Sequence, residues 1–291
     1  MTYDLFIGDR TFSSWSLRGW LMLEKFDLPY RTTMIGLYGG TMAEDLATLA
    51  PARTVPVLRT PDGAILSDTL AMAETLAEQN PDAELWPADP LARGLARSMV
   101  AEMHSSFGAL RGDCPMMLAH AWDGFAPSDA VRRDLDRITD LWQLARDRHG
   151  SGGPWLFGRY SLADVFYAPV ATRIATYALP VGAAARDYVA QTLADPAFRR
   201  WRAMGLTQTY DPMPYRQPLA ERPWPGPAPL SAVAVTDGVA ENATCPYSGD
   251  PVTHLMRMEG RVFGFCNAFC RDKTVADPEA WPAFMALLRA G

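Results

Sequence analysis

The sequence predicts a mixed α/β domain, then an all-helical domain, then a small cysteine-bearing module. Three observations support this reading. Short apolar runs alternate with helical patterns near the start, helical periodicity dominates from Pro90 onward, and three of the four cysteines lie in the last fifth of the chain. The 291 residues, 48% of them hydrophobic and 21% charged, suffice for more than one core. The expected boundaries are 1–82, 83–210, a proline-rich linker at 211–244, and a module at 245–291.

The first domain is predicted from its alternating periodicities and turn residues. In chain order we expect a strand at 3–7, a helix at 15–23, a strand at 30–37, a short helix at 44–49, two strands around the Pro-Asp-Gly turn 61–63, and a helix at 69–79. This β-α-β-α-β-β-α order is the thioredoxin-type arrangement.

The second domain is predicted to be helical throughout. The expected helices are 91–120, 128–149, 161–179, 186–193 and 196–204. Ser161 and Asp164 have the spacing of a capping box, which is a folding element. The prolines of 211–230 are spaced so closely that they favour an extended linker over regular helix or sheet.

Composition excludes several classes of function. A net charge of −6 and a pI near 5.3 argue against a nucleic-acid or acidic-membrane partner. No signal peptide is visible, and no apolar run is long enough to cross a bilayer, so a cytoplasmic location is expected. Clustered cysteines without an export signal favour metal or redox chemistry over a disulfide framework.

Three polar features of the first domain are informative together. Ser13-Ser14 precede the first helix, Val55-Pro56 enter a strand, and Asp68-Thr69 begin the third predicted helix. Each alone is typical of simple capping or of a proline turn. At this spacing, and with Gly153–Gly158 leading into the capping box, residues 1–205 resemble the glutathione transferase superfamily. The run Phe12–Arg18 is most similar to its serine-type, zeta-like classes.

The resemblance implies a set of glutathione contacts. Pro56 would be the family's cis-proline, and the Val55 backbone would pair with the cysteinyl backbone of glutathione like an added strand. Asp68 and Thr69 would hold the γ-glutamyl end, where a helix N-terminus favours a carboxylate.

The resemblance also implies that a serine activates the glutathione thiol. Ser13 aligns best with the zeta-class catalytic serine, and Ser14 stays open as the alternative. A shift of about two pKa units would stabilise the thiolate by about 2.7 kcal/mol. The loop has no cysteine, which argues against the cysteine-type transferases. Arg173 does not align clearly with the substrate arginine of the zeta-class isomerase, so the electrophile site is unassigned.

The C-terminal module is predicted to bind metal. Cys245, Cys266 and Cys270, with 20 and three residues between them, resemble the small YHS or TRASH metal-binding domains. Three thiolates suit Zn²⁺ or Cu⁺, and His254 is the first candidate for a fourth ligand. A module of about 45 residues rarely folds without a metal or a packing partner. Free thiols packed on the helical domain, or a disulfide, are the alternatives.

The leading hypothesis is a glutathione transferase-like enzyme acting with glutathione on a small electrophile. The family also implies a homodimer. The alternatives are a glutathione-binding or metal-sensing protein without substantial turnover, and a zeta-like glutathione-dependent isomerase.

Overall fold

A computed structural model describes residues 2–208 and 215–290. The predicted domain boundary between 210 and 211 lies outside the described residues, as do Pro212 and Pro214 of the predicted linker. By its internal contacts the chain divides into two compact units. The first is Met1–Leu193 with Pro212–Pro225, and the second is Ala194–Asp211 with Gly226–Gly291. Among the described helices, none has the length and apolar character of a membrane span.

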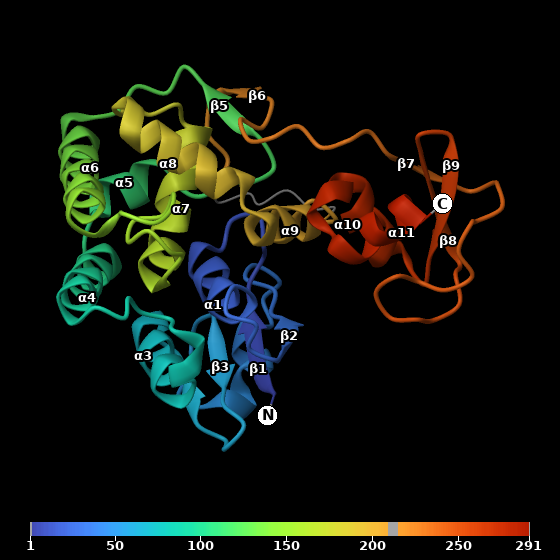
Figure 1. Cartoon of the computed structure of the whole chain (residues 1–291), viewed down its shortest axis with the longest axis horizontal. Coiled ribbons are helices and arrows are strands. Elements are labelled where there is room, and N and C mark those ends of the chain that lie inside the picture. Colours follow the sequence, from blue (N-terminus) through green and yellow to red (C-terminus); the bar gives the residue numbers. More distant parts are fainter. Residues whose placement is uncertain (1, 209–214, 291) are drawn as a thin grey trace. The chain divides into compact units, whose positions relative to one another are not determined.

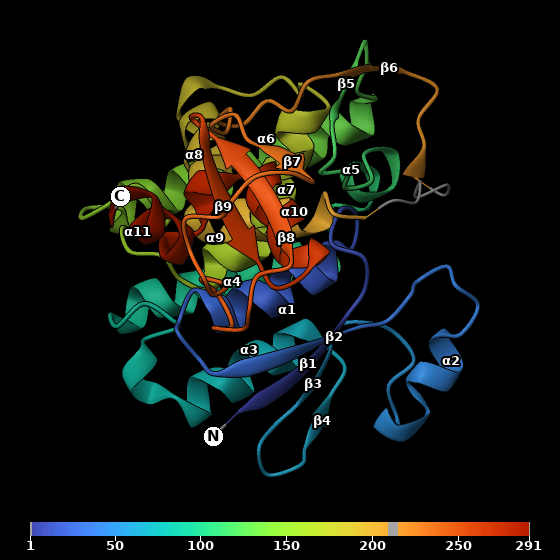
Figure 2. The same cartoon turned by 90° about the vertical axis from the view of Figure 1, so that its right-hand side faces the viewer.

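The first unit begins with a four-stranded sheet in the order β2-β1-β3-β4 (Figures 1 and 2). β1 runs parallel to β2 and antiparallel to β3, so the predicted thioredoxin-type topology is confirmed. The elements are β1 (Tyr3–Ile7), α1 (Ser14–Glu24), β2 (Tyr30–Met34), α2 (Met42–Asp45), η1 (Ala47–Leu49), β3 (Val57–Arg59), β4 (Ile65–Leu66), α3 (Thr69–Gln79) and η2 (Pro81–Ala83). β2 ends three residues earlier than predicted, before a glycine-rich turn.

Helix α1 is buried along most of its length because it packs against both β1 and α7. Gly19 lets the Pro56 ring pack closely against this helix: a Cβ at position 19 would lie 3.1 Å from Pro56 Cγ and 3.2 Å from Pro56 Cβ. The helix therefore accepts the entropic cost of an interior glycine so that the Pro56 ring can sit against it.

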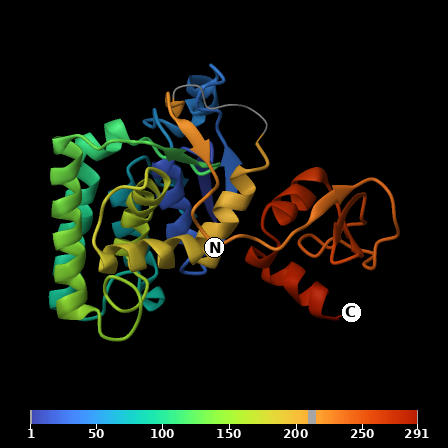
Figure 3. The same cartoon turned by 90° about the horizontal axis from the view of Figure 1, so that it is seen from above.

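The helical part of the first unit contains α4 (Pro90–Ser105), α5 (Gly108–Asp113), β5 (Ala121–Asp123), the long α6 (Asp129–His149, green in Figure 3), α7 (Leu162–Thr176) and α8 (Ala183–Ala194). The predicted single helix 91–120 is wrong. Phe107 adopts a left-handed conformation with φ of 58°, which ends α4, and α5 stops before Cys114-Pro115.

The predicted capping box at the start of α7 is confirmed. Asp164 Oδ2 accepts hydrogen bonds from Ser161 N at 2.9 Å and Ser161 Oγ at 3.3 Å. Asp164 Oδ1 accepts from Leu156 N and from Tyr188 Oη, both at 3.1 Å. One buried carboxylate thus ties the N-terminus of α7 to the preceding turn and to α8.

Replacing Asp164 by alanine is expected to lower the free energy of unfolding by about 3 kcal/mol, because buried donors lose their acceptor. Burial raises the pKa of Asp164 to about 6, so its stabilising contribution declines as the pH rises from about 4 through 6. The loss should therefore be larger at pH 5 than at pH 8, by about 1 kcal/mol. Urea unfolding at both pH values measures this, with the exposed Asp147→Ala as the control.

The second unit is built on a three-stranded antiparallel sheet in the order β7-β8-β9. Its elements are α9 (Pro196–Gly205), β7 (Val233–Val235), β8 (His254–Met258), β9 (Arg261–Phe265), α10 (Ala268–Ala276), η4 (Pro278–Ala280) and α11 (Pro282–Ala290). Glu259 and Gly260 both have positive φ, as a tight β8–β9 hairpin turn requires. Phe263 and Phe265 pack on Phe284 of α11 to form the core.

Helix α9, placed by the sequence at the end of the helical domain, packs against α10 in the second unit. Arg199 on α9 forms ion pairs with Asp277 at 2.6 Å and with Glu279 at 3.2 Å. The proline-rich run also differs from expectation. A short strand β6 (Ala220–Arg222) forms between Pro218 and Pro223 and pairs with β5, since three residues are enough for this ladder.

Candidate functional site

The first unit contains a cavity of about 690 Å³ beside the N-terminus of α1. Its wall combines the serine loop, the turn before β3, the α4–α5 region and α7. The residues that line it include Ser13, Ser14, Val55, Arg111, Arg173 and Tyr215.

Ser13 lies at the N-cap of α1, but its hydroxyl does not cap the helix. Ser13 Oγ donates to Ser16 Oγ at 2.8 Å, and Ser16 Oγ also accepts from Gly8 N at 2.9 Å. The Ser13 proton is therefore engaged within the loop.

Ser14 has a different environment. Its Oγ accepts from Arg173 Nη2 at 3.4 Å, which leaves its own hydroxyl proton available to a ligand. Arg173 is held in place by Cys114 O at 2.8 Å and Pro169 O at 3.1 Å. Burial lowers the pKa of Arg173 to about 10, so it stays charged at neutral pH.

Two further arginines surround Trp15, the residue after Ser14. The guanidinium carbons of Arg18 and Arg111 lie 4.8 Å and 4.5 Å from the centre of the Trp15 ring. Arg18 is fully buried, and its guanidinium nitrogens find no hydrogen-bond partner among the described residues. Burial, followed by repulsion from Arg173 and Arg111, lowers its pKa to about 9. The wall beside the serines is thus positively charged and favours anions.

The predicted glutathione contacts fall into two groups. The Val55–Pro56 peptide bond is cis, and Val55 lines the cavity with the two serines.

Asp68 and Thr69 lie at the N-terminus of α3 and are not among the cavity-lining residues. Asp68 Oδ1 accepts from Leu70 N at 2.8 Å, and its Oδ2 is 3.0 Å from His104 Nε2. The Thr69 hydroxyl is buried without a partner among the described residues.

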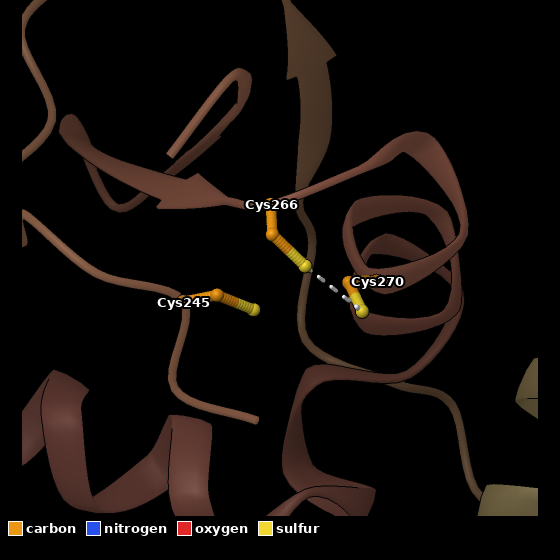
Figure 4. A group of neighbouring side chains, drawn as sticks. All are labelled: Cys245, Cys266 and Cys270. Carbon is orange, nitrogen blue, oxygen red and sulfur yellow. Dashed lines mark hydrogen bonds between the residues drawn. The ribbon is translucent and has the colours of Figure 1, made fainter. Parts of the chain in front are cut away.

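The three predicted cysteine ligands form a cluster in the second unit (Figure 4). The sulfur atoms of Cys245, Cys266 and Cys270 all lie within 4.8 Å of one another, and all are free thiols. His254 is not in this group; its Nδ1 lies 2.9 Å from Thr253 Oγ1. Ser248 Oγ instead donates to Cys266 Sγ at 3.3 Å.

Local structure favours ionisation of Cys245, whereas burial raises the pKa of Cys270 to about 12. Burial opposes ionisation of Cys245, but backbone N–H donors from Cys266, Tyr247 and Ser248 outweigh it and lower the pKa of the thiol to about 7. Asn267 caps α10 through Cys270 N at 2.8 Å and also donates to Cys266 Sγ at 3.3 Å. The arrangement offers three soft ligands on a β-strand end, a helix and a turn.

Sequence comparison supports the assignment of the first domain. Residues 12–79 match the family described as glutathione S-transferase, N-terminal domain. A probable maleylacetoacetate isomerase of Caenorhabditis elegans is 29% identical over 142 residues, covering 48% of this chain and 65% of that protein. The maleylacetoacetate isomerase of Rattus norvegicus is 34% identical over 100 residues, covering 33% and 44%. The chain thus matches less than two thirds of either relative.

Solved structures extend the likeness to the helical part. A glutathione transferase homologue from Burkholderia, crystallised with bound glutathione, is 22% identical with a TM-score of 0.53, over 72% of this chain and 100% of that one. Glutathione transferase Omega 2S from Trametes versicolor is 20% identical with a TM-score of 0.54, over 71% and 96%. The chain therefore has the glutathione-transferase fold, a thioredoxin-like domain followed by a helical domain.

The sequence left Arg173 without an assigned role and gave no signal for Arg111 or Arg18. Arg18 lies within the serine run Phe12–Arg18, but its burial without a partner among the described residues cannot be predicted from its sequence neighbours. Arg111 and Arg173 lie far from the serines along the chain, so only the fold brings them to Ser14 and Trp15.

Proposed function

We propose that this protein is a glutathione-dependent enzyme that activates the glutathione thiol for attack on a small electrophile. The observation that supports this most is the meeting of Ser13, Ser14, Val55 and Arg173 at one cavity beside a helix N-terminus. A hydroxyl donor, a helix dipole and a buried cation each favour a thiolate over a thiol.

Ser14 is the proposed donor to the glutathione sulfur. Its oxygen accepts from Arg173, so its proton can point to the ligand, whereas the Ser13 proton is bound by Ser16. Ser13 then acts by holding the loop. The backbone of Val55, which lines the cavity, would pair with the cysteinyl unit, and Asp68 with Thr69 would receive the γ-glutamyl end.

The electrophile is proposed to carry a carboxylate. Arg111 and Arg173 both line the cavity, and a buried guanidinium recognises a carboxylate strongly. This specific observation also favours the second candidate, a glutathione-dependent isomerase of an unsaturated diacid. The names of the two relatives, both maleylacetoacetate isomerases, agree with that candidate.

Calorimetric titration with glutathione tests the proposal directly. Saturable binding is expected, and its absence would favour the binding or sensing alternative for other ligands. Incubation with an unsaturated diacid then separates the two enzyme candidates. An isomerase returns the glutathione unchanged, whereas a transferase consumes one glutathione for each substrate molecule.

Replacing Arg173 by methionine is expected to raise the KM for a carboxylated electrophile about 20-fold, because a charge-assisted contact is lost. The KM for its methyl ester should change less than threefold. Steady-state kinetics on the acid and the ester measure this difference. Arg186→Met, on α8 and away from the cavity, is the control. An equal rise in KM for the acid and for the ester would contradict the role given to Arg173.

The cysteine cluster is proposed to hold a zinc ion, with Cu⁺ as the other metal suited to soft ligands. Cys245, Cys266 and Cys270 would supply three thiolates, and the Ser248 hydroxyl or a water could complete a tetrahedron. When bound, such a metal would supply structural cross-linking to this small module. The homodimer and the cytoplasmic location stay predictions.

A further inference from the structure

The segment 215–225 belongs to the first unit and is anchored there. β6 pairs with β5, and Arg222 donates to two carbonyl oxygens: Nε to Trp122 O at 3.0 Å and Nη2 to Ala175 O at 3.1 Å. Ala175 lies in the last turn of α7, the helix that carries Arg173. Residues 220–222 are thereby held against α7, the helix whose Arg173 lines the cavity.

Tyr215, at the beginning of the described part of the segment, lines the cavity. Its ring stacks on Phe12 with centroids 5.1 Å apart and an interplanar angle of 29°. Phe12 directly precedes the two serines, so the phenol of Tyr215 is fixed relative to the serine loop. Tyr38 packs edge-on against the same ring at 6.0 Å.

The hydroxyl of Tyr215 is an oriented donor. Tyr38 Oη donates to Tyr215 Oη at 2.8 Å, which uses the only proton of the Tyr38 hydroxyl. Tyr215 Oη accepts that bond, so its own proton is available to the cavity. Arg173 and Tyr215 both line this cavity.

We propose that Tyr215 is a catalytic residue that donates a hydrogen bond to the carbonyl oxygen of an α,β-unsaturated electrophile. This role rests on the proposed function. The glutathione thiolate forms a bond to the β-carbon, the C=C electron pair moves between the α-carbon and the carbonyl carbon, and the C=O electron pair moves onto oxygen. The phenol stabilises that enolate oxygen and keeps its proton. The proton released from the thiol passes to solvent, and solvent supplies one proton to the α-carbon, so the addition has no net proton change.

Tyr215→Phe tests this role because it keeps the ring and removes only the donor. With 4-phenylbut-3-en-2-one, an unsaturated ketone, kcat is expected to fall about tenfold, less than for a fully enclosed oxyanion donor. With benzyl chloride, where no oxygen anion forms, kcat should change less than twofold. Tyr30→Phe, whose hydroxyl pairs with Glu24 and does not line the cavity, is the matched control.

The outcomes separate this inference from the proposed function. If Tyr215→Phe lowered kcat equally for both substrates, or left kcat for the ketone unchanged, the role of Tyr215 would be overturned. The proposed glutathione chemistry would still stand. If the wild-type protein neither binds glutathione by calorimetry nor turns over either substrate, the proposed function fails and this role with it. Retention of the wild-type melting temperature by Tyr215→Phe shows that a lower kcat does not reflect misfolding.

Discussion

Replacing Ser14 by alanine is expected to lower the glutathione-dependent kcat/KM about 100-fold at pH 7. The proposed hydroxyl donor stabilises the glutathione thiolate by about two pKa units, or about 2.7 kcal/mol, and alanine removes it. The apparent pKa of the bound thiol should rise by the same amount. The pH profile of kcat/KM measures this shift, and the activity of the variant should approach that of the wild type near pH 9.

Ser13→Ala is the matched control for this prediction. Its hydroxyl donates to Ser16 within the loop, so we expect a loss of about threefold with little change in the apparent pKa. If Ser13→Ala produced the larger pKa shift, Ser13 would be the donor, as the alignment with the zeta class suggests. If neither single variant nor the double variant changed the profile, serine activation of the thiol would be refuted.

Removing the proposed metal ion from the second unit is expected to unfold its cysteine-bearing part. The aromatic core around Phe284 is small, and the free energy of metal binding in such modules is largely folding free energy, about 10 kcal/mol or more. Hydrogen exchange of the β8 and β9 amides should therefore rise at least 100-fold after chelation. Elemental analysis of the untreated protein should give one metal ion per chain.

Cysteine variants test whether the metal binds at the cysteine cluster. Cys266→Ser should abolish metal binding and increase the same amide exchange rates. Cys114→Ser, which alters a buried cysteine of the first unit, should retain one metal ion. Unchanged amide protection in metal-free wild-type protein would show instead that the module folds on its own packing, including Lys273 against the rings of Tyr247 and Trp281 at 3.9 and 4.0 Å.

The features that sequence could predict are those encoded locally. The alternation of strand and helix in the first domain, the capping box at Ser161 and the cis Val55–Pro56 bond implied by the resemblance all agree with the structure. Each depends on residues that are close along the chain. The break after Ser105 was missed because a left-handed phenylalanine carries no propensity signal.

The features that sequence could not predict depend on long-range contacts. Arg173 reaches Ser14 from 159 positions away, and Tyr215 reaches Phe12 from a segment that composition described only as proline-rich. The choice between Ser13 and Ser14 depends on which hydroxyl proton is already bound, and this requires coordinates. The same holds for His254, which is close to the cysteines in sequence but is not part of their cluster.

The contact between Gly19 and Pro56 has a consequence for the spacing of the cavity. Helix α1 carries Ser14 at its first turn and Gly19 in its interior, where the Pro56 ring rests within 3.2 Å of the missing Cβ. Helix α1 therefore sets the position of Ser14, the proposed hydrogen-bond donor to the glutathione sulfur. It also sets how closely the Val55–Pro56 backbone, which would hold the ligand, approaches that serine. A side chain at position 19 would require the Pro56 ring to move by a few tenths of an ångström relative to the helix that carries Ser14. In this way, the absence of one methyl group fixes the separation between the two halves of the proposed glutathione site.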